Sequence, residues 1–307
     1  MPKRLSDIFS TLLSGHKKTD QTTVRIKRTR VEKPKDIPTK ELPVITTPHL
    51  ITGIGHSEGL QRDHNEDTLF TLTTCISGEN GSQPFGIFIV ADGMGGHQYG
   101  SKASGIAARV MAEHLLEHIY KPLLCYPPKQ PKDALQDIMR TGLLEAHQSV
   151  IKLAPGGGTT LTAAVVIGQQ MTLAHAGDSR AYAIHHNQHM EVLTRDHSLV
   201  KRLVELNQIT QEEAISHPKR HVLYRALGQG EPLEPEIITS TYPNNGYLLI
   251  CSDGLWSVVD EDQIYKIITQ APNLPVACQQ LIEAANTAGG PDNIAIILVQ
   301  SVGQNGS

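Results

Sequence analysis

The sequence contains no long hydrophobic run and few cysteines or aromatic residues. No stretch approaches the roughly 18 consecutive apolar residues that indicate a spanning helix, and the start MPKRLSDIF has neither an apolar core nor a small-residue cleavage site. The four cysteines, Cys75, Cys125, Cys251 and Cys278, form no CxxC pair, which argues against zinc ribbons, iron–sulfur clusters and a disulfide framework. We therefore expect a protein of the reducing cytoplasm, with neither a membrane span nor a secretion signal.

The charge is distributed unevenly along the 307 residues, of which 39% are apolar, enough for one sizeable core. The formal net charge is -4, yet residues 1–41 hold eleven Lys or Arg against five Asp or Glu. The rest of the chain is therefore acidic. A nucleic-acid enzyme usually carries its basic surface on the folded part, so we expect bound cations rather than a nucleic-acid partner.

Residues 1–46 are predicted to form a basic tail outside the folded domain. Residues 17–47 combine basic charge, threonine and proline with few large apolar side chains, which is typical of a disordered linker. Ahead of it, five apolar residues spaced as on one helix face predict a short amphipathic helix: Leu5, Ile8, Phe9, Leu12 and Leu13. This helix would contact a partner, a membrane surface or its own domain, and simple disorder is the alternative. The expected domain covers 47–302, with 303–307 as a C-terminal tail, and we expect a monomer.

Within the expected domain, short β-type runs are interspersed with helical patterns. The runs cover 50–55, 85–92, 159–168, 170–177, 180–186, 246–254 and 293–301. The helical patterns cover 100–120, 131–153, 199–207, 211–216, 261–270 and 275–288. Consecutive runs between 159 and 186 are joined by two or three residues, a length that only antiparallel hairpins tolerate. The sequence therefore predicts an α+β fold built on antiparallel sheets rather than a doubly wound parallel sheet.

Acidic residues stand at the ends of four predicted strands, beside a glycine or in a Gly-Gly-Pro-Asp turn. They are Asp92, Asp178, Asp253 and Asp292. Glycine lets the backbone turn sharply and lets its carbonyl approach a ligand. A single Asp-Gly pair is usually a turn, but four carboxylates delivered by strand ends indicate a shared site.

A second group, Arg62, Glu66 and Asp67, follows the first strand in QRDHNEDTLF. Buried carboxylates that converge from different strands repel one another, so they need protons, arginine partners or metal ions. Ligation by oxygen alone selects hard cations such as Mg²⁺ or Mn²⁺. Two such ions can share a carboxylate and lower the pKa of a water between them, which suits in-line attack on phosphorus. Arginine binds phosphate oxygens bidentately, which is the role we predict for Arg62.

The same segments carry motifs in an order that resembles a known family. The motifs are RDHNED (62–67), VADGMGGH (90–97), GGTTLTAAVV (157–166), AHAGDSRAY (174–182), LTRDHSLV (193–200), YRALG (224–228), LLICSDGLW (248–256) and GGPDNIAIILV (289–299). Over about 49–302 the chain resembles the metal-dependent Ser/Thr protein phosphatases of the PP2C (PPM) family, in the bacterial form. The resemblance implies an antiparallel β-sandwich flanked by helix pairs (α-β-β-α) and a binuclear Mn²⁺ or Mg²⁺ centre at one end.

The resemblance also implies which residues would hold the metals. Asp92 would bridge the two ions, and Asp253 and Asp292 would complete the ligands of the first. Glu66 and the Gly93 carbonyl would bind the second. Catalysis would then transfer the phosphoryl group directly to water, without a phosphoenzyme.

Other residues matched by the resemblance would act around the metals. Asp67 would orient a metal-bound water, Arg62 would bind the phosphate, and Asp178 would hold a weaker third ion shared with Asp253. Eukaryotic relatives often carry histidine after the Asp-Gly pair as general acid, whereas this chain has Met94. The acid would therefore be a metal-bound water or His97, and a helix-entry role for His97 is the alternative.

The segment 196–228 resembles the flap of these phosphatases, a mobile helical lid. Its basic side chains would meet acidic phosphopeptides or stay solvated: Lys219, Arg220, His221 and Arg225. A histidine-rich stretch, His185, His186 and His189, follows a predicted strand. We interpret it as a hairpin tip rather than a metal-binding tract.

The predicted function is a protein serine/threonine phosphatase that acts on phosphoserine and phosphothreonine in signalling. Its partners would be phosphorylated proteins, substrates of a Ser/Thr kinase, with no nucleic acid. The alternative is a phosphatase-fold regulator or scaffold that binds phosphoproteins without turnover, which would not need a full metal set. A two-metal nuclease would require a basic groove that the acidic body does not offer.

Overall fold

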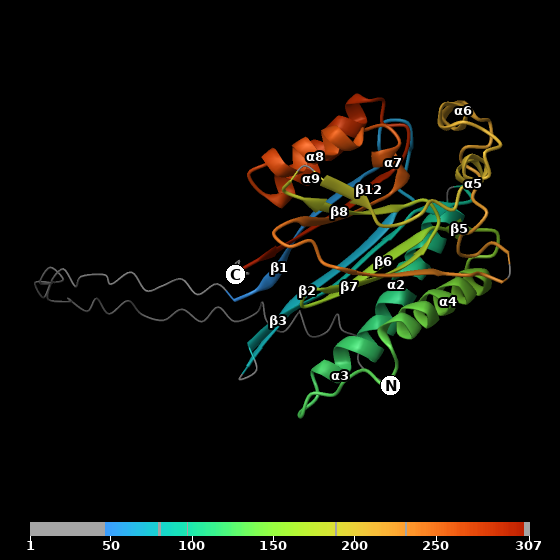
Figure 1. The fold of residues 1–307 in the computed structure, drawn as a ribbon. Coiled ribbons are helices and arrows are strands. Elements are labelled where there is room, and N and C mark those ends of the chain that lie inside the picture. Colours follow the sequence, from blue (N-terminus) through green and yellow to red (C-terminus); the bar gives the residue numbers. More distant parts are fainter. Residues whose placement is uncertain (1–46, 79–80, 97, 188, 231, 304–307) are drawn as a thin grey trace, which may run out of the picture. The chain divides into compact units, whose positions relative to one another are not determined.

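The described part of the chain contains two antiparallel β-sheets with helices on their outer faces. The computed structural model describes residues 47–78, 81–96, 98–187, 189–230 and 232–303. Its two five-stranded sheets face one another, with helices on both sides (Figure 1). The predicted α+β class and the α-β-β-α sandwich are confirmed. The predicted tail and its amphipathic helix lie outside the described residues.

The first sheet pairs the first and last strands of the domain. Its order is β1 (His49–Ser57), β12 (Ile294–Val302), β11 (Tyr247–Cys251), β8 (Arg180–His185) and β9 (His189–Val192). The register of the β1–β12 pair runs from His49 opposite Val302 to Ser57 opposite Ile294. The loop between β8 and β9 confirms that the histidine-rich stretch forms a hairpin tip.

The second sheet contains the predicted hairpin from 161 to 176. Its order is β10 (Glu236–Thr241), β7 (Gln170–Ala176), β6 (Leu161–Ile167), β3 (Gly81–Ala91) and β2 (Thr68–Gly78). The β6–β7 turn contains Gly168 at φ +61°, in the region that glycine favours. A short ribbon of β4 (Gly93–Met94) and β5 (Gly158–Thr159) extends the end of this sheet that carries the acidic residues.

Helices cover both outer faces of the sandwich, as Figure 1 shows. Over the second sheet lie α2 (Gln98–Leu115), which continues as the π-helix η1 (Leu116–Tyr120) and α3 (Lys121–Leu123), and α4 (Leu135–Leu153). Over the first sheet lie α7 (Asp253–Trp256), α8 (Glu261–Gln270) and α9 (Leu274–Thr287). The flap segment holds α5 (Leu199–Glu205) and α6 (Gln211–Ser216), and α6 begins with a capping box between Thr210 and Glu213.

Three apolar layers hold the sandwich together. On β3, Ile87 and Ile89 pack against the helices over the second sheet, while Phe88 and Val90 pack between the two sheets. Burying one such side chain stabilises the fold by roughly 1.5–3 kcal/mol. Because both faces of the central strands are covered, their sequences read as continuous apolar runs rather than as alternating ones.

One predicted hairpin is wrong. The runs 170–177 and 180–186 become β7 and β8, which belong to different sheets. Gly177, at φ +123°, allows the chain to leave one sheet and enter the other within three residues. A Cβ at Gly177 would lie 2.5 Å from the side chain of Thr160, so the close crossing also requires the absence of a side chain.

The sequence analysis also missed strands β2, β9 and β10, which lie at sheet edges. Edge strands such as EIITST in β10 carry many polar residues and lack the apolar run that marks a central strand. Among the described residues, no helix combines the length and apolar character needed to cross a membrane.

Candidate metal centre

The predicted acidic residues meet at one end of the sandwich. Asp92 follows β3, Asp178 follows β7, Asp253 follows β11, and Asp292 precedes β12. Asp92 is half-buried and feels the charges of the other three and of Asp67. Residues separated by up to 225 positions therefore form one cluster, as the sequence predicts.

The backbone of Asp92 is fixed by two threonines of the GGTT motif. Thr160 Oγ accepts a hydrogen bond from the Asp92 N–H at 3.0 Å. The Asp92 carbonyl accepts from Thr159 Oγ at 2.9 Å and from the Thr160 N–H at 2.8 Å. These hydrogen bonds hold the main chain at the point where the carboxylate leaves the end of β3.

Glu66 lies against the glycine that follows Asp92. A Cβ on Gly93 would collide with the Gly100 carbonyl, and one on Gly100 would collide with the Glu66 carboxylate. Residue 93 requires glycine because the backbone passes too close for a side chain, whereas a side chain at residue 100 would displace the Glu66 carboxylate. The result brings the Glu66 carboxylate and the Gly93 backbone together, as the predicted ligand pair requires.

Asp67 and Asp253 lie deep in the centre and are joined through Ser252. Ser252 Oγ donates to Asp67 Oδ2 at 2.8 Å and accepts from the Ala295 N–H at 2.8 Å. Asp67 Oδ1 and Asp253 Oδ1 are buried, and no group in the described part of the chain donates a hydrogen bond to them. Buried carboxylate oxygens without donors are costly unless a cation or proton compensates them.

The proximity of these acids shifts their pKa values upward. Burial, followed by the Asp253 charge, raises the pKa of Asp67 to about 8. Burial, followed by the Asp292 charge, raises the pKa of Asp253 to about 6. The pKa of Asp92 lies well above its ordinary value, because of burial and then the charge of Asp67. The donor set consists of carboxylate oxygens, so these residues fit a hard cation such as Mn²⁺ or Mg²⁺.

The backbone of Asp178 is bound by Trp256, whose ring stacks on the Arg180 guanidinium. Trp256 Nε1 donates to the Asp178 carbonyl at 3.0 Å, and the Arg180 guanidinium carbon lies 3.6 Å from the Trp256 ring centre. Arg180 also binds both oxygens of Asp196, at 2.9 and 2.7 Å. Burial and then the Asp253 charge raise the pKa of Asp178, so this carboxyl belongs electrostatically to the cluster.

Arg62 stands at the edge of the cluster and is half exposed. Its Nη2 donates to Asp292 Oδ2 at 2.7 Å, a pair that the sequence analysis did not anticipate. A guanidinium has five N–H donors, so this contact leaves donors for a phosphate. In the flap, burial and then the charge of Arg220 lower the pKa of His221. The Asp292 charge opposes this shift, and the Arg62 charge adds to it, both more weakly.

Three residues of the site have no role in the sequence analysis. Asn293 Oδ1 accepts from the Glu66 N–H at 2.8 Å, and its Nδ2 donates to the carbonyls of Glu58 and His64, each at 3.0 Å. The ring of His64 lies 2.9 Å from Glu66 Oε1. Asn293 and His64 thus position Glu66, and Ser252 positions Asp67. In the sequence, only their adjacency to the acidic motifs marks these three residues. His97, the predicted general-acid candidate, lies outside the described residues.

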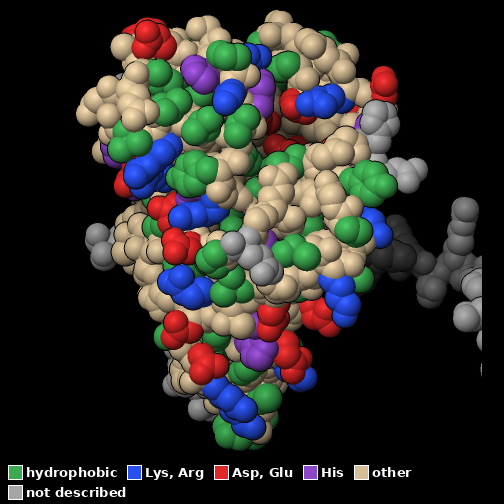
Figure 2. Space-filling view, turned by 90° about the vertical axis from the view of Figure 1, so that its right-hand side faces the viewer, with side chains coloured by type: hydrophobic (Ala, Val, Ile, Leu, Met, Phe, Trp, Pro, Cys, Tyr) green, Lys and Arg blue, Asp and Glu red, His purple; other side chains and the backbone are tan. Residues whose placement is uncertain are grey.

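One face of the molecule shows a hollow with acidic side chains in its depth (Figure 2). Lys and Arg side chains lie beside its opening, and elsewhere on this face basic and acidic side chains are interspersed. A nucleic-acid groove would present a continuous basic band instead. On this face the charges of both signs are therefore mixed rather than segregated.

Comparisons with known proteins agree with this arrangement. The family model described as "Protein phosphatase 2C" matches residues 53–294. A serine/threonine phosphatase, stp, of Listeria welshimeri is 34% identical over 248 residues, covering 79% of this chain and 92% of that protein.

Solved structures show the same fold. A serine/threonine phosphatase of S. agalactiae aligns with TM-score 0.68 and 29% identity, covering 82% of this chain and 99% of that one. The catalytic domain of the phosphatase PstP in complex with two manganese ions aligns with TM-score 0.66 and 28% identity, covering 83% and 100%. The chain therefore belongs to the protein phosphatase 2C family and is a metal-dependent serine/threonine protein phosphatase.

Proposed function

We propose that this enzyme hydrolyses phosphoserine and phosphothreonine in proteins at a binuclear Mn²⁺ or Mg²⁺ centre. The observation that carries the proposal is the cluster of Asp67, Asp92 and Asp253, in which two buried carboxylate oxygens have no donor from the described residues. The PstP structure with two manganese ions supports the same metal count. A scaffold without turnover would have no need for such a destabilising set of acids.

The ligands follow from the positions of the carboxylates. We assign Asp92 as the bridging ligand, Asp253 and Asp292 to the first ion, and Glu66 with the Gly93 carbonyl to the second. Asp178, beside Asp253, would hold a weaker third ion. When bound, the ions supply an activated water and neutralise charge on the phosphate.

The remaining residues orient the reactants. Arg62 directs its free N–H donors at phosphate oxygens, which fixes the phosphorus for in-line attack. Asp67 is held by Ser252 through Oδ2, so its Oδ1 is left to accept a hydrogen bond from the attacking water. The bond from water oxygen to phosphorus forms as the bond from phosphorus to the serine or threonine oxygen breaks. The attacking water gives up one proton, and the departing oxygen takes up one proton.

Several wider assignments accompany this proposal. We propose that residues 47–302 form the phosphatase domain, with 196–228 as its flap and 303–307 as a tail. Its substrates would be proteins phosphorylated by a Ser/Thr kinase. We propose the cytoplasm as its location because the sequence holds four scattered cysteines without a CxxC pair, a pattern typical of a reducing compartment. Contact between the basic tail and a partner or membrane surface stays a prediction.

The substrate class can be tested with peptides. We expect the Mn²⁺-loaded enzyme to release phosphate from phosphoserine and phosphothreonine peptides, and EDTA to stop the reaction. Matched phosphotyrosine peptides are the control for substrate class. Phosphate release that persists in EDTA would contradict a metal-dependent reaction.

Replacing Arg62 by alanine separates phosphate binding from metal binding. We expect KM for a phosphopeptide to rise by about tenfold or more, because a charge-assisted contact to the phosphate is lost. Metal affinity should change less, since Arg62 donates to only one carboxylate oxygen of Asp292. Steady-state kinetics and Mn²⁺ titration measure the two effects, and Arg109→Ala is the matched control at an exposed position on α2. Weak Mn²⁺ binding with an unchanged KM would show that Arg62 serves the metals instead.

A further inference from the structure

A cavity lies between helix α4, the flap segment and the start of β10. Its volume is about 680 Å³, and four of its lining residues are arginines: Arg140, Arg195, Arg202 and Arg225. We call it the arginine cavity. No proposed metal ligand lines it. Its size falls in the range of pockets that hold small molecules.

The arginines are only partly compensated by acidic groups. Arg195 and Arg202 share one partner, Glu205. Arg225 lies 3.5 Å from Glu234, whose side chain is 80% exposed. Arg140 has no acidic partner within ion-pair distance among the residues that the structure describes. Guanidinium groups from four separate segments thus face one space with donors to spare, which favours an anion.

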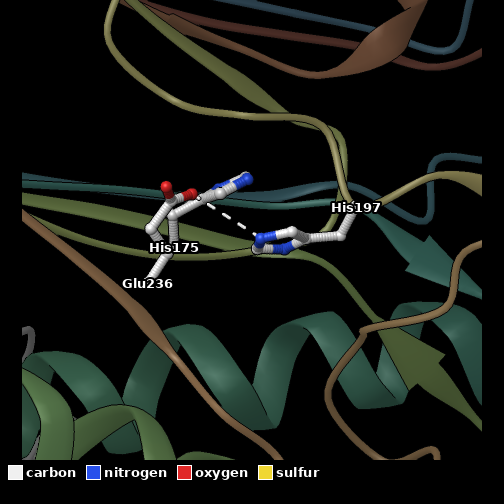
Figure 3. Close-up of side chains that lie close together, drawn as sticks. All are labelled: His175, His197 and Glu236. Carbon is white, nitrogen blue, oxygen red and sulfur yellow. Dashed lines mark ion pairs between the residues drawn. The ribbon is translucent and has the colours of Figure 1, made fainter. Parts of the chain in front are cut away.

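Two residues that line the cavity, His197 and Glu236, form with the buried His175 a group that resembles a metal site by residue type. Figure 3 shows His175, His197 and Glu236 together, with an ion-pair contact of 3.6 Å between His197 and Glu236. His175 Nε2 donates to the Arg195 carbonyl at 3.1 Å, so this nitrogen is already occupied. A cation there would also lie beside the Arg225 guanidinium. The cluster therefore does not favour a metal.

The proton arrangement on His197 leaves Arg225 free to bind a ligand. His197 Nδ1 accepts from the Gly177 N–H at 3.1 Å, so in the neutral ring the proton is on Nε2. Burial lowers the pKa of His197 to about 3 and that of His175 to about 4, so both rings are neutral near pH 7. Arg225 Nη1 lies 3.2 Å from the same Nε2, a pairing of two donors. Arg225 therefore lacks an acceptor at this nitrogen.

His197 connects this wall to the metal centre. Its ring Nδ1 accepts from the Gly177 N–H at 3.1 Å, and its backbone N–H donates to the Gly177 carbonyl at 2.7 Å. Gly177 is the crossing point between the two sheets and directly precedes Asp178. One histidine therefore contacts both Arg225 and the backbone next to Asp178.

We propose that the arginine cavity binds a small dianion of the phosphate class, and that its occupancy acts on Asp178 through Arg225, His197 and Gly177. The dianion would supply the acceptor that Arg225 lacks and draw its guanidinium away from His197. The effect on turnover rests on the proposed role of Asp178, whereas binding in the cavity does not.

Binding can be measured with sulfate, which is a phosphate-like dianion but not a reaction product. Calorimetry would use the full-length, Mn²⁺-loaded chain carrying Arg62→Ala, which reduces sulfate binding at the metal centre. We expect Arg140→Gln with Arg202→Gln to weaken sulfate binding by at least about tenfold, and Arg109→Gln, outside the cavity, to leave it unchanged. Thermal unfolding shows whether each variant is folded. If the double variant is unfolded, the two single variants are measured in its place. No sulfate binding before substitution, or equal affinity in every variant, would overturn the proposal.

The effect on turnover separates the cavity from the metal centre. Sulfate that competes with substrate at the metals raises KM, whereas sulfate in the arginine cavity is expected to lower kcat by about fivefold. The Arg140→Gln/Arg202→Gln enzyme should keep its kcat without sulfate and lose the sulfate effect on kcat. A sulfate effect confined to KM would refute the coupling, even if calorimetry shows binding in the cavity.

Discussion

Replacing Asp92 by asparagine is expected to lower phosphatase turnover by at least about a thousandfold while the fold survives. The substitution replaces the carboxylate that would bridge both ions with a neutral amide. The backbone contacts of residue 92 to Thr159 and Thr160 do not involve the carboxylate and should persist. Hydrolysis of an aryl phosphate with saturating Mn²⁺ measures the loss.

Two further measurements make the Asp92 result specific. Asp262→Asn, on the exposed surface of α8, removes a carboxylate far from the centre and should leave turnover unchanged. Thermal unfolding shows whether the Asp92→Asn chain is folded, and metal titration shows whether Mn²⁺ binding is lost. Near-normal turnover by a folded Asp92→Asn protein would refute the bridging role.

The metal-free protein is expected to become less stable as the pH rises from about 5 to about 8, by on the order of 5 kcal/mol. Folding raises the pKa of Asp67 to about 8 and that of Asp253 to about 6, above the ordinary value of 3.8. The folded state therefore holds protons that the unfolded state has released. Stability is greatest below the ordinary pKa and is lost as the pH rises through the folded values.

Mn²⁺ should remove this pH dependence because it compensates the ionised carboxylates. Urea unfolding at several pH values, in EDTA and in Mn²⁺, measures both slopes. Asp67→Asn should flatten the slope in EDTA, since the variant lacks one raised pKa, and Asp262→Asn should not. A metal-free protein that gains stability over the same pH range would contradict the assignment of raised pKa values.

Much of this fold and site can be predicted from residues that are close in sequence. Apolar runs between 159 and 176 define a hairpin, and the carboxylates at 92 and 253 are recognisable because each ends a strand beside glycine. Such signals are local, since one strand and one turn contain them. The placement of the first and last strands in one sheet and the pairing of Arg62 with Asp292 are not local, because they depend on how distant segments pack.

The error at 177–180 has a similar cause. A short connection normally implies a hairpin, but Gly177 crosses between sheets because Thr160 and His197 hold it from other segments. The arginine cavity was likewise not predictable from sequence. Arg140 lies on α4 and Arg225 lies in the flap segment, and nothing in their local sequence indicates that they share a space.

The pairing of β1 with β12 determines how a fusion partner or surface anchor would orient this domain. His49 and Val302 are cross-strand neighbours, while the opposite ends of the same strands, Ser57 and Ile294, adjoin the acidic loops. Nine residues of extended strand span about 30 Å. An attachment at either terminus of the domain therefore lies at the opposite end of these strands from the acidic loops. Immobilisation through either terminus should preserve access to the site for large substrates.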